Sequence, residues 1–325
     1  REMKALQPNQ LSASYAKADV LVCDPQHNIR HQTHAALRDI GFISVVDVAE
    51  LESAKNALVS NRFDLVILAM NSADDGTATL IRQTRQQRHN HDPFVPVIVS
   101  VWQARQDLID AAINAGADDL MRKPFSIGIL AKRINMLVHA RKPFVATSDY
   151  FGPDRRRRTE SCDDAGTVEV PNTLREKVQG RHQSKENRQA VDKALAQLQR
   201  TKVRNIARRI ALLAEMAQSC VAHTEAAEHW TTIMADIGEE TAAYRRALHP
   251  SYPESFGTLC DAVAHTANSL RAMRPDMRGA ALLEKSALAL KLASDINDDG
   301  ANIADAISAA LNNASNTLRN AAGSG

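Results

Sequence analysis

The sequence is poor in cysteine, in aromatic residues and in long apolar runs, and each shortage excludes a class of protein. Four cysteines occur in 325 residues, with no C-x-x-C pair, which excludes a disulfide scaffold and a zinc ribbon. Aromatic residues make up 4% of the chain, too few for a base-stacking nucleic-acid platform. No stretch approaches the ~18 consecutive apolar residues of a transmembrane helix. We therefore expect a cytoplasmic protein without a membrane span.

The charge is nearly balanced overall but is unevenly distributed along the chain. The net charge is +2, yet residues 151–209 hold 15 lysines and arginines against 8 acidic residues, and residues 210–325 hold 8 against 14. This asymmetry is compatible with self-association or with a phosphate-bearing partner. A solvated basic helix face beside an acidic bundle is the simpler interpretation.

Residues 18–141 alternate short apolar runs with segments of helical spacing. The runs lie at 20–23, 43–46, 65–70, 97–101 and 120–122, and the helical segments at 29–40, 49–59, 77–85, 106–114 and 127–138. The run at 65–70 is apolar throughout, which is typical of a central parallel strand covered on both faces. The pattern predicts an α/β fold, a (βα)5 doubly wound parallel sheet with its site at the carboxyl ends of the strands.

Short motifs follow the predicted strands in a fixed order. They are Cys23-Asp24-Pro25 with Arg30 six residues after Asp24, Asp75-Gly76, Ala115-Gly116-Ala117-Asp118, and Lys123-Pro124-Phe125. In this order and spacing they resemble the receiver domain of bacterial response regulators, over roughly residues 19–141. The resemblance implies a part in two-component signal transduction.

The chain departs from the receiver family at the phosphoacceptor. In that family the third strand ends in the aspartate that takes a phosphoryl group from a sensor kinase, and Ala69 stands here instead. A methyl group cannot attack phosphorus. The family's second acidic residue, which helps to hold magnesium, is replaced by Pro25, and Asp24 alone provides poorly for an octahedral Mg²⁺ ion.

A third departure concerns the serine or threonine that the family places after its fourth strand. Counting back from Lys123 puts Val101 at this position, and an offset of one residue directs Ser100 to the other face of the sheet. We interpret the domain as a pseudo-receiver with no catalytic residue, no metal and no cofactor. Asp24 and Lys123 remain, and we expect them to form an internal ion pair.

Residues 142–181 are rich in glycine, proline and charged residues. This composition predicts a flexible basic linker. Within it, Tyr150-Phe151-Gly152-Pro153-Asp154 and the run Arg155–Arg158 resemble a motif that follows receivers in some alphaproteobacterial regulators. The four arginines offer bidentate contacts to an acidic or phosphate partner. A solvated linker is the simpler interpretation of this run.

Residues 182–321 predict an all-helical bundle that serves as an interaction or output domain. Helical spacing is found at 184–220, then up to residue 248, and at 255–273, 280–296 and 303–318. The first of these helices would be roughly 55 Å long, more than ~20-residue helices can cover.

We therefore predict a homodimer or a hetero-complex formed through residues 191–210 of the long helix. The apolar residues that would carry it are Val191, Leu195, Leu198, Val203 and Ile206. The positive charges of Arg204 and Arg208 favour an antiparallel pair or an acidic partner. The expected function is that of a non-enzymatic adaptor in bacterial signalling.

Two alternatives are less favoured. The basic band at residues 200–209 is compatible with RNA or DNA binding, although the acidic helices after it repel a phosphate backbone. His265 faintly resembles the histidine of a phosphotransfer bundle, but Asn268 and Ser269 stand where that family has lysine and glycine.

Overall fold

The computed structural model describes residues 15–86, 92–155, 166–181, 184–222, 229–250, 252–271 and 277–295. The chain divides into two compact units. The first comprises Arg1–Val145 and Tyr150–Leu198, and the second comprises Ala146–Asp149 and Gln199–Gly325. The sequence-based boundary near residue 181 thus differs from the division in the structure, which falls inside a helix.

A five-stranded parallel sheet forms the centre of the first unit. Its strands are β1 (Asp19–Cys23), β2 (Ser44–Val48), β3 (Leu65–Ala69), β4 (Val97–Val101) and β5 (Asp119–Arg122). Their order in the sheet is β2-β1-β3-β4-β5, and all the pairings are parallel. The sheet confirms the predicted fold class and places the carboxyl ends of the strands at one edge.

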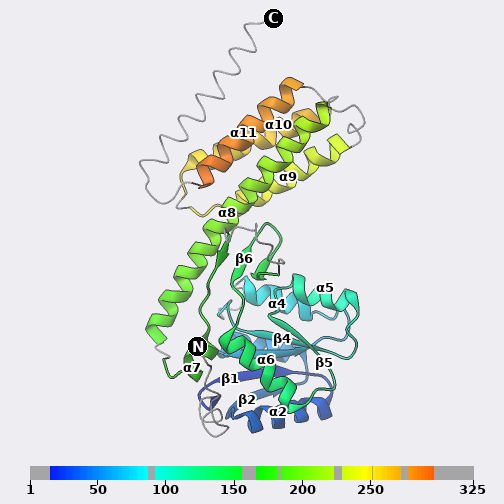
Figure 1. Ribbon diagram of the computed structural model, residues 1–325, viewed down its shortest axis with the longest axis vertical. Helices are drawn as coiled ribbons and strands as arrows, with labels where there is room; N and C mark the ends of the chain where they lie inside the picture. Colours follow the sequence, from blue (N-terminus) through cyan, green and yellow to red (C-terminus); the bar gives the residue numbers. More distant parts are fainter. Residues whose placement is uncertain are drawn as a thin grey trace, which may run out of the picture. The chain divides into compact units, whose positions relative to one another are not determined.

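Five helices cover the two faces of this sheet (Figure 1). Their bounds are α2 (His27–Ile40), α3 (Leu51–Ser60), α4 (Thr77–Arg85), α5 (Gln106–Asn114) and α6 (Ile127–His139). Helices α2 and α6 pack through Leu37 and Ile134 on one face, with Val22 and Ile67 of the strands. Helices α3, α4 and α5 pack on the other face. Strand residues therefore alternate between two separate apolar cores.

The structure differs from the predicted flexible linker, because the described residues after α6 form regular elements. These are β6 (Phe144–Ala146), β7 (Phe151–Pro153) and β8 (Thr167–Val168), in the order β7-β6-β8, followed by α7 (Thr173–Val178). The rings of Phe144 and Phe151 lie 5.5 and 6.2 Å from that of Phe94, which precedes β4. The extension therefore shares an aromatic core with the first unit.

A buried carboxylate also joins the extension to the sheet. Asp118 accepts hydrogen bonds from Arg85 Nη2 at 2.8 Å and from Arg141 Nε at 2.7 Å, and all three side chains are at most 3% exposed. Burial alone would raise the pKa of Asp118, but Arg141 and Arg85 outweigh it and hold that pKa below its ordinary value.

Arg155 is part of the same junction. Its Nη2 donates to the backbone carbonyls of Ala117 and Asp118, the latter at 2.7 Å. Arg155 is therefore engaged within the chain rather than free to hold an acidic partner. Arg156, Arg157 and Arg158 lie outside the described residues.

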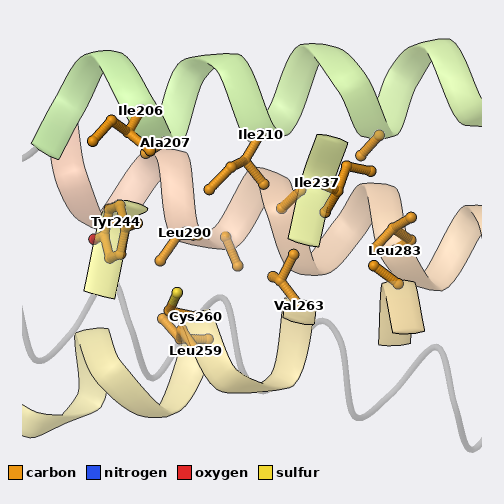
Figure 2. Packing of buried hydrophobic residues seen from close by; sticks show 14 of the residues in the cluster. Ile206, Ala207, Ile210, Ile237, Tyr244, Leu259, Cys260, Val263, Leu283 and Leu290 are labelled. Carbon is orange, nitrogen blue, oxygen red and sulfur yellow. The ribbon is translucent and has the colours of Figure 1, made fainter. Parts of the chain in front are cut away.

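The second unit is a helical bundle. It contains α8 (Ser184–Ala222) from Gln199 onward, α9 (Trp230–Ala247), α10 (Glu254–Arg271) and α11 (Met277–Asp295). Figure 2 shows Ile206, Ile210, Tyr244 and Leu290 directed into the space between these helices. The predicted helices up to residue 296 are found in the structure, and the one predicted at 303–318 lies outside the described residues. Within those residues, no helix is both long enough and apolar enough to cross a membrane.

Each of the two units holds one buried cysteine among the described residues, Cys23 in the first and Cys260 in the second, which allows the units to be followed separately. Burial raises the pKa of Cys23 to about 11 and that of Cys260 to about 12, and Cys220 is half-buried. At pH 8 we expect iodoacetamide to modify Cys220 in the native chain. Cys23 and Cys260 should react only in urea, each at its own concentration, in a Cys162→Ser background. Labelling of both at one concentration would show that the chain unfolds as a single unit.

Gly152 of β7 is expected to be required for docking of the extension. A Cβ atom at this position would stand 2.7 Å from the Cα of Gly116 in the turn before β5. Gly152→Ala should therefore lower the free energy of unfolding of the first unit by about 1–3 kcal/mol, measured by the urea dependence of Cys23 labelling. Gly128→Ala is the control, because its Cβ would meet nothing closer than 3.9 Å. Equal effects of the two substitutions would contradict the close packing.

Candidate functional site

Four side chains from four strand ends meet on the sheet face that α2 and α6 cover. Ala69 ends β3 and pairs with Ser100 of β4. Cys23 pairs with Leu68, so that Asp24 follows β1 level with Ala69. Lys123 follows β5 and stands two residues after Met121, so both side chains project to the same face of the sheet. Met121 belongs to the core under α2 and α6. The parallel sheet thus brings together residues that are up to 99 positions apart.

Asp24 and Lys123 form a buried ion pair at this site. Lys123 Nζ lies 2.9 Å from Asp24 Oδ2, and the two side chains are 0% and 4% exposed. Asp24 Oδ1 also accepts the backbone N–H of Gln26 at 2.9 Å, and Arg30 Nη1 donates to the Asp24 carbonyl at 2.8 Å. The structure therefore contains the ion pair that we expected, and both oxygens of the carboxylate already have donors.

Ala69, which we predict to stand at the phosphoacceptor position, ends β3. It is 6% exposed, and its carbonyl accepts a hydrogen bond from Thr77 Oγ1 at 3.2 Å. Its side chain offers neither a nucleophile nor a metal ligand. The nearby Asp75 is also engaged, since its carboxylate accepts the backbone N–H groups of Asn71 at 2.7 Å and Thr77 at 2.9 Å. Asp75 thus shapes the loop between β3 and α4.

The structure places Ser100 and Val101, the residue that we predict at the serine or threonine position, on opposite faces of the sheet. Residues opposite each other in a parallel pair project to the same face, so Ser100 lies on the face of Ala69. Val101 is fully buried in the other core, with Val97 and Val99. Of the predicted pocket residues, Asp24 and Lys123 thus keep charged side chains.

An aromatic ring adjoins the ion pair. Lys123 Nζ lies 5.3 Å from the centroid of the Trp102 ring, within the range of a cation–π contact. Pro25 is exposed and carries no ligand atom in the second acidic position. Within the described ranges, no group of three or more histidine, cysteine, aspartate or glutamate residues is arranged to hold a metal ion.

The predicted interaction residues of the long helix are mostly buried in the chain itself. Leu198, Val203 and Ile206 are at most 1% exposed, whereas Val191 and Leu195 are half-buried. This corrects the prediction that residues 191–210 present a free apolar stripe. The predicted stripe failed because helices α9 to α11 cover the helix from Val203 onward.

The basic residues of the same helix also have partners within the bundle. Arg204 and Arg208 lie 3.4 and 3.0 Å from Asp295 at the end of α11. Arg209 Nε lies 3.0 Å from Oε1 of Glu240, a carboxylate that is 7% exposed. The positive charges at these three positions are therefore compensated by acidic residues of the second unit. His265 is exposed on α10.

The comparisons with known proteins assign the first unit to a class. Residues 20–135 match the family described as response regulator receiver domain. This stretch therefore forms a receiver domain of the kind found in two-component response regulators. The match ends at residue 135, within α6.

Relatives resemble the chain over the same part. The KDP operon transcriptional regulatory protein KdpE of Escherichia coli K12 is 31% identical over 137 residues, 40% of this chain and 58% of that protein. The chemotaxis protein CheY of Pseudomonas aeruginosa is 27% identical over 36% of this chain and 94% of its own length. The chain thus spans little more than half the length of KdpE. A structure of the Vibrio cholerae chemotaxis protein CheY4 covers 36% of this chain, at 23% identity and a TM-score of 0.32.

The ion pair provides a test of the pocket. Asp24→Asn leaves the ammonium group of Lys123 buried without a carboxylate and should cost about 3–5 kcal/mol of unfolding free energy. Lys123→Met should cost a similar amount, and the double variant should cost less than the sum. Hydrogen exchange of the β3 amides measures each value. The control Arg133→Met breaks the more exposed pair with Asp119 and should cost at most about 1 kcal/mol. Additive effects of the two pocket variants would contradict the pairing.

Proposed function

We propose that this protein is a receiver that takes up no phosphate and acts as an adaptor in bacterial signalling, through contacts with other proteins in the cytoplasm. The observation that carries the proposal is Ala69 at the end of β3, beside a pocket that keeps the ion pair of Asp24 and Lys123. Phosphoryl transfer needs an anionic oxygen in line with the donor, and the alanine supplies none. The adaptor is therefore a binding protein and not an enzyme.

The charges in the pocket support the same proposal. Lys123 is fully buried and its positive charge is compensated by Asp24 at 2.9 Å. An incoming phosphoryl group would compete with a carboxylate that is already in place. The pair also makes the pocket stable without any ligand, because neither charge is left uncompensated.

The receiver retains a surface through which it can bind a protein. Receivers commonly pair through the surface of α5, β5 and α6 (family helix four, strand five and helix five), and on α6 the side chains of Ile129 and Met136 are each 48% exposed. They stand seven residues apart, and therefore on one helix face. Arg133 between them pairs with Asp119 of β5 at 3.0 Å. Two apolar side chains around an ion pair suit a receiver-like or other folded protein partner.

Nucleic-acid binding receives less support than protein binding. The nucleic-acid hypothesis rests on the basic band at residues 200–209. Within this band, Arg204, Arg208 and Arg209 all form ion pairs with acidic side chains of the bundle. A phosphate backbone would have to displace these partners.

Acetyl phosphate and beryllofluoride test the first half of the proposal. We expect no phosphoryl adduct on the wild-type protein by intact-mass spectrometry, with or without Mg²⁺. Pro25→Asp/Ala69→Asp restores both missing carboxylates to the pocket, and this double variant should form an adduct. Each single variant should remain inactive, since it provides fewer hard oxygens for Mg²⁺. A base-labile adduct on any wild-type aspartate would overturn the proposal.

A complementation experiment tests the second half. Ile129→Asp/Met136→Asp, introduced into the full chain, should fail to restore the transcript profile of a strain from which the gene is deleted. Val59→Asp is the matched control, because Val59 is 54% exposed on α3, outside the surface formed by α5, β5 and α6. Full restoration by the α6 variant would show that this surface is not the site of interaction.

A further inference from the structure

A buried carboxylate in the second unit has one oxygen without a hydrogen-bond donor. Glu240 lies in the middle of α9, and its side chain is 7% exposed. Its Oε1 accepts a hydrogen bond from Ser148 Oγ at 3.2 Å and lies 3.0 Å from Arg209 Nε. Its Oε2 is buried, and no donor among the described residues reaches it. Half of this carboxylate is therefore removed from water without compensation.

The charged groups around Glu240 compensate it incompletely. Arg209 of α8 opposes its negative charge, but the Arg209 side chain is 56% exposed and solvent screens it. Two carboxylates repel that charge, Asp236 one turn earlier on α9 and Asp149, which belongs to the same unit. Lys202 of α8 interacts with Asp149.

The other helices of the bundle add no charge that compensates Glu240. Asp261 of α10 and Asp295 of α11 each pair with an arginine, at 3.5 and 3.0 Å. The thiol of Cys260 on α10 donates to the carbonyl of Thr241, next to Glu240, at 3.3 Å. Burial raises the pKa of this thiol to about 12, so it stays neutral. The balance at Glu240 is thus one exposed guanidinium group against two carboxylates.

This environment makes the folded bundle bind a proton at Glu240. Burial raises the pKa of Glu240 above its ordinary value of 4.5, and Arg209 opposes this only in part. Because the folded bundle holds the proton more tightly than the unfolded chain does, the proton stabilises the fold. That stabilisation is complete below the ordinary pKa and is lost as the pH rises through the raised pKa.

We propose that Glu240 is a proton-binding switch in the bundle, which favours the contact between α8 and α9 when it is protonated and loosens that contact when it is ionised. A glutamine would keep both contacts of Oε1 without burying a charge. The carboxylate is therefore retained at a cost in stability that a purely structural role does not explain. The proposal does not depend on the chemistry of the receiver pocket.

Urea unfolding of the full chain tests the switch. In a Trp102→Phe background the remaining tryptophan is Trp230, which is buried in the bundle and donates to the Leu270 carbonyl at 3.0 Å. Its fluorescence therefore follows the second unit. Glu240→Gln imitates the protonated side chain, and Glu239→Gln, at the exposed neighbouring position, is the matched control.

We expect the stabilities of Glu240→Gln and the unsubstituted background to differ least at pH 5 and to diverge as the pH rises. At pH 8 the unfolding equilibrium constant of Glu240→Gln should be on the order of tenfold lower, because no unsatisfied charge is buried. Glu239→Gln should follow the background at every pH.

Each other outcome overturns the proposal. A glutamine variant that is less stable than the background at pH 8 would show that the carboxylate is a net stabilising partner of Arg209. A difference that does not change with pH, or that is equally large in the control, would remove the link to protonation of Glu240. Hydrogen exchange of the α9 amides in the unsubstituted chain provides an independent measurement. Corrected for the intrinsic effect of pH, it should be faster at pH 8 than at pH 5, and equal rates would contradict the switch.

Discussion

The buried carboxylate of Asp118 is the interaction on which the first unit depends. It joins Arg85 at the end of α4, Arg141 after α6 and the backbone N–H of Val97 in β4. A buried charge that loses its partners costs several kcal/mol of unfolding free energy. These elements should therefore separate together rather than one at a time. Arg141 begins the segment that continues into β6, and Arg155 binds the same turn from the other end of β7. The extension after the receiver is thereby part of its structure.

At the opposite edge of the sheet, the pocket holds a buried ion pair and has an alanine at the end of β3. Ala69 removes the nucleophile, and the remaining charges of Asp24 and Lys123 compensate each other at 2.9 Å. In the function that we propose, the contribution to signalling comes from surfaces such as that of α6, where exposed apolar side chains surround an ion pair.

In the bundle, burial decides which surfaces are available to a partner. The apolar stripe of α8 from Val203 to Ala217 is used within the unit, and Arg204 and Arg208 pair with Asp295. What remains exposed is on the outer sides of α8 and α11, at Leu212, Met216 and Leu292.

Local patterns in the sequence determined the βα alternation, the long helix α8 and the missing acceptor at Ala69, because periodicity and residue identity act over a few neighbouring positions. Tertiary structure alone decided that Ser100 shares the sheet face of Ala69 while Val101 is buried in the other core, since strand register depends on pairing. It also decided that the segment after α6 is ordered, through Asp118 and the contact of Gly152 with Gly116. Those contacts join residues far apart in the chain, and no local pattern records which of them will meet.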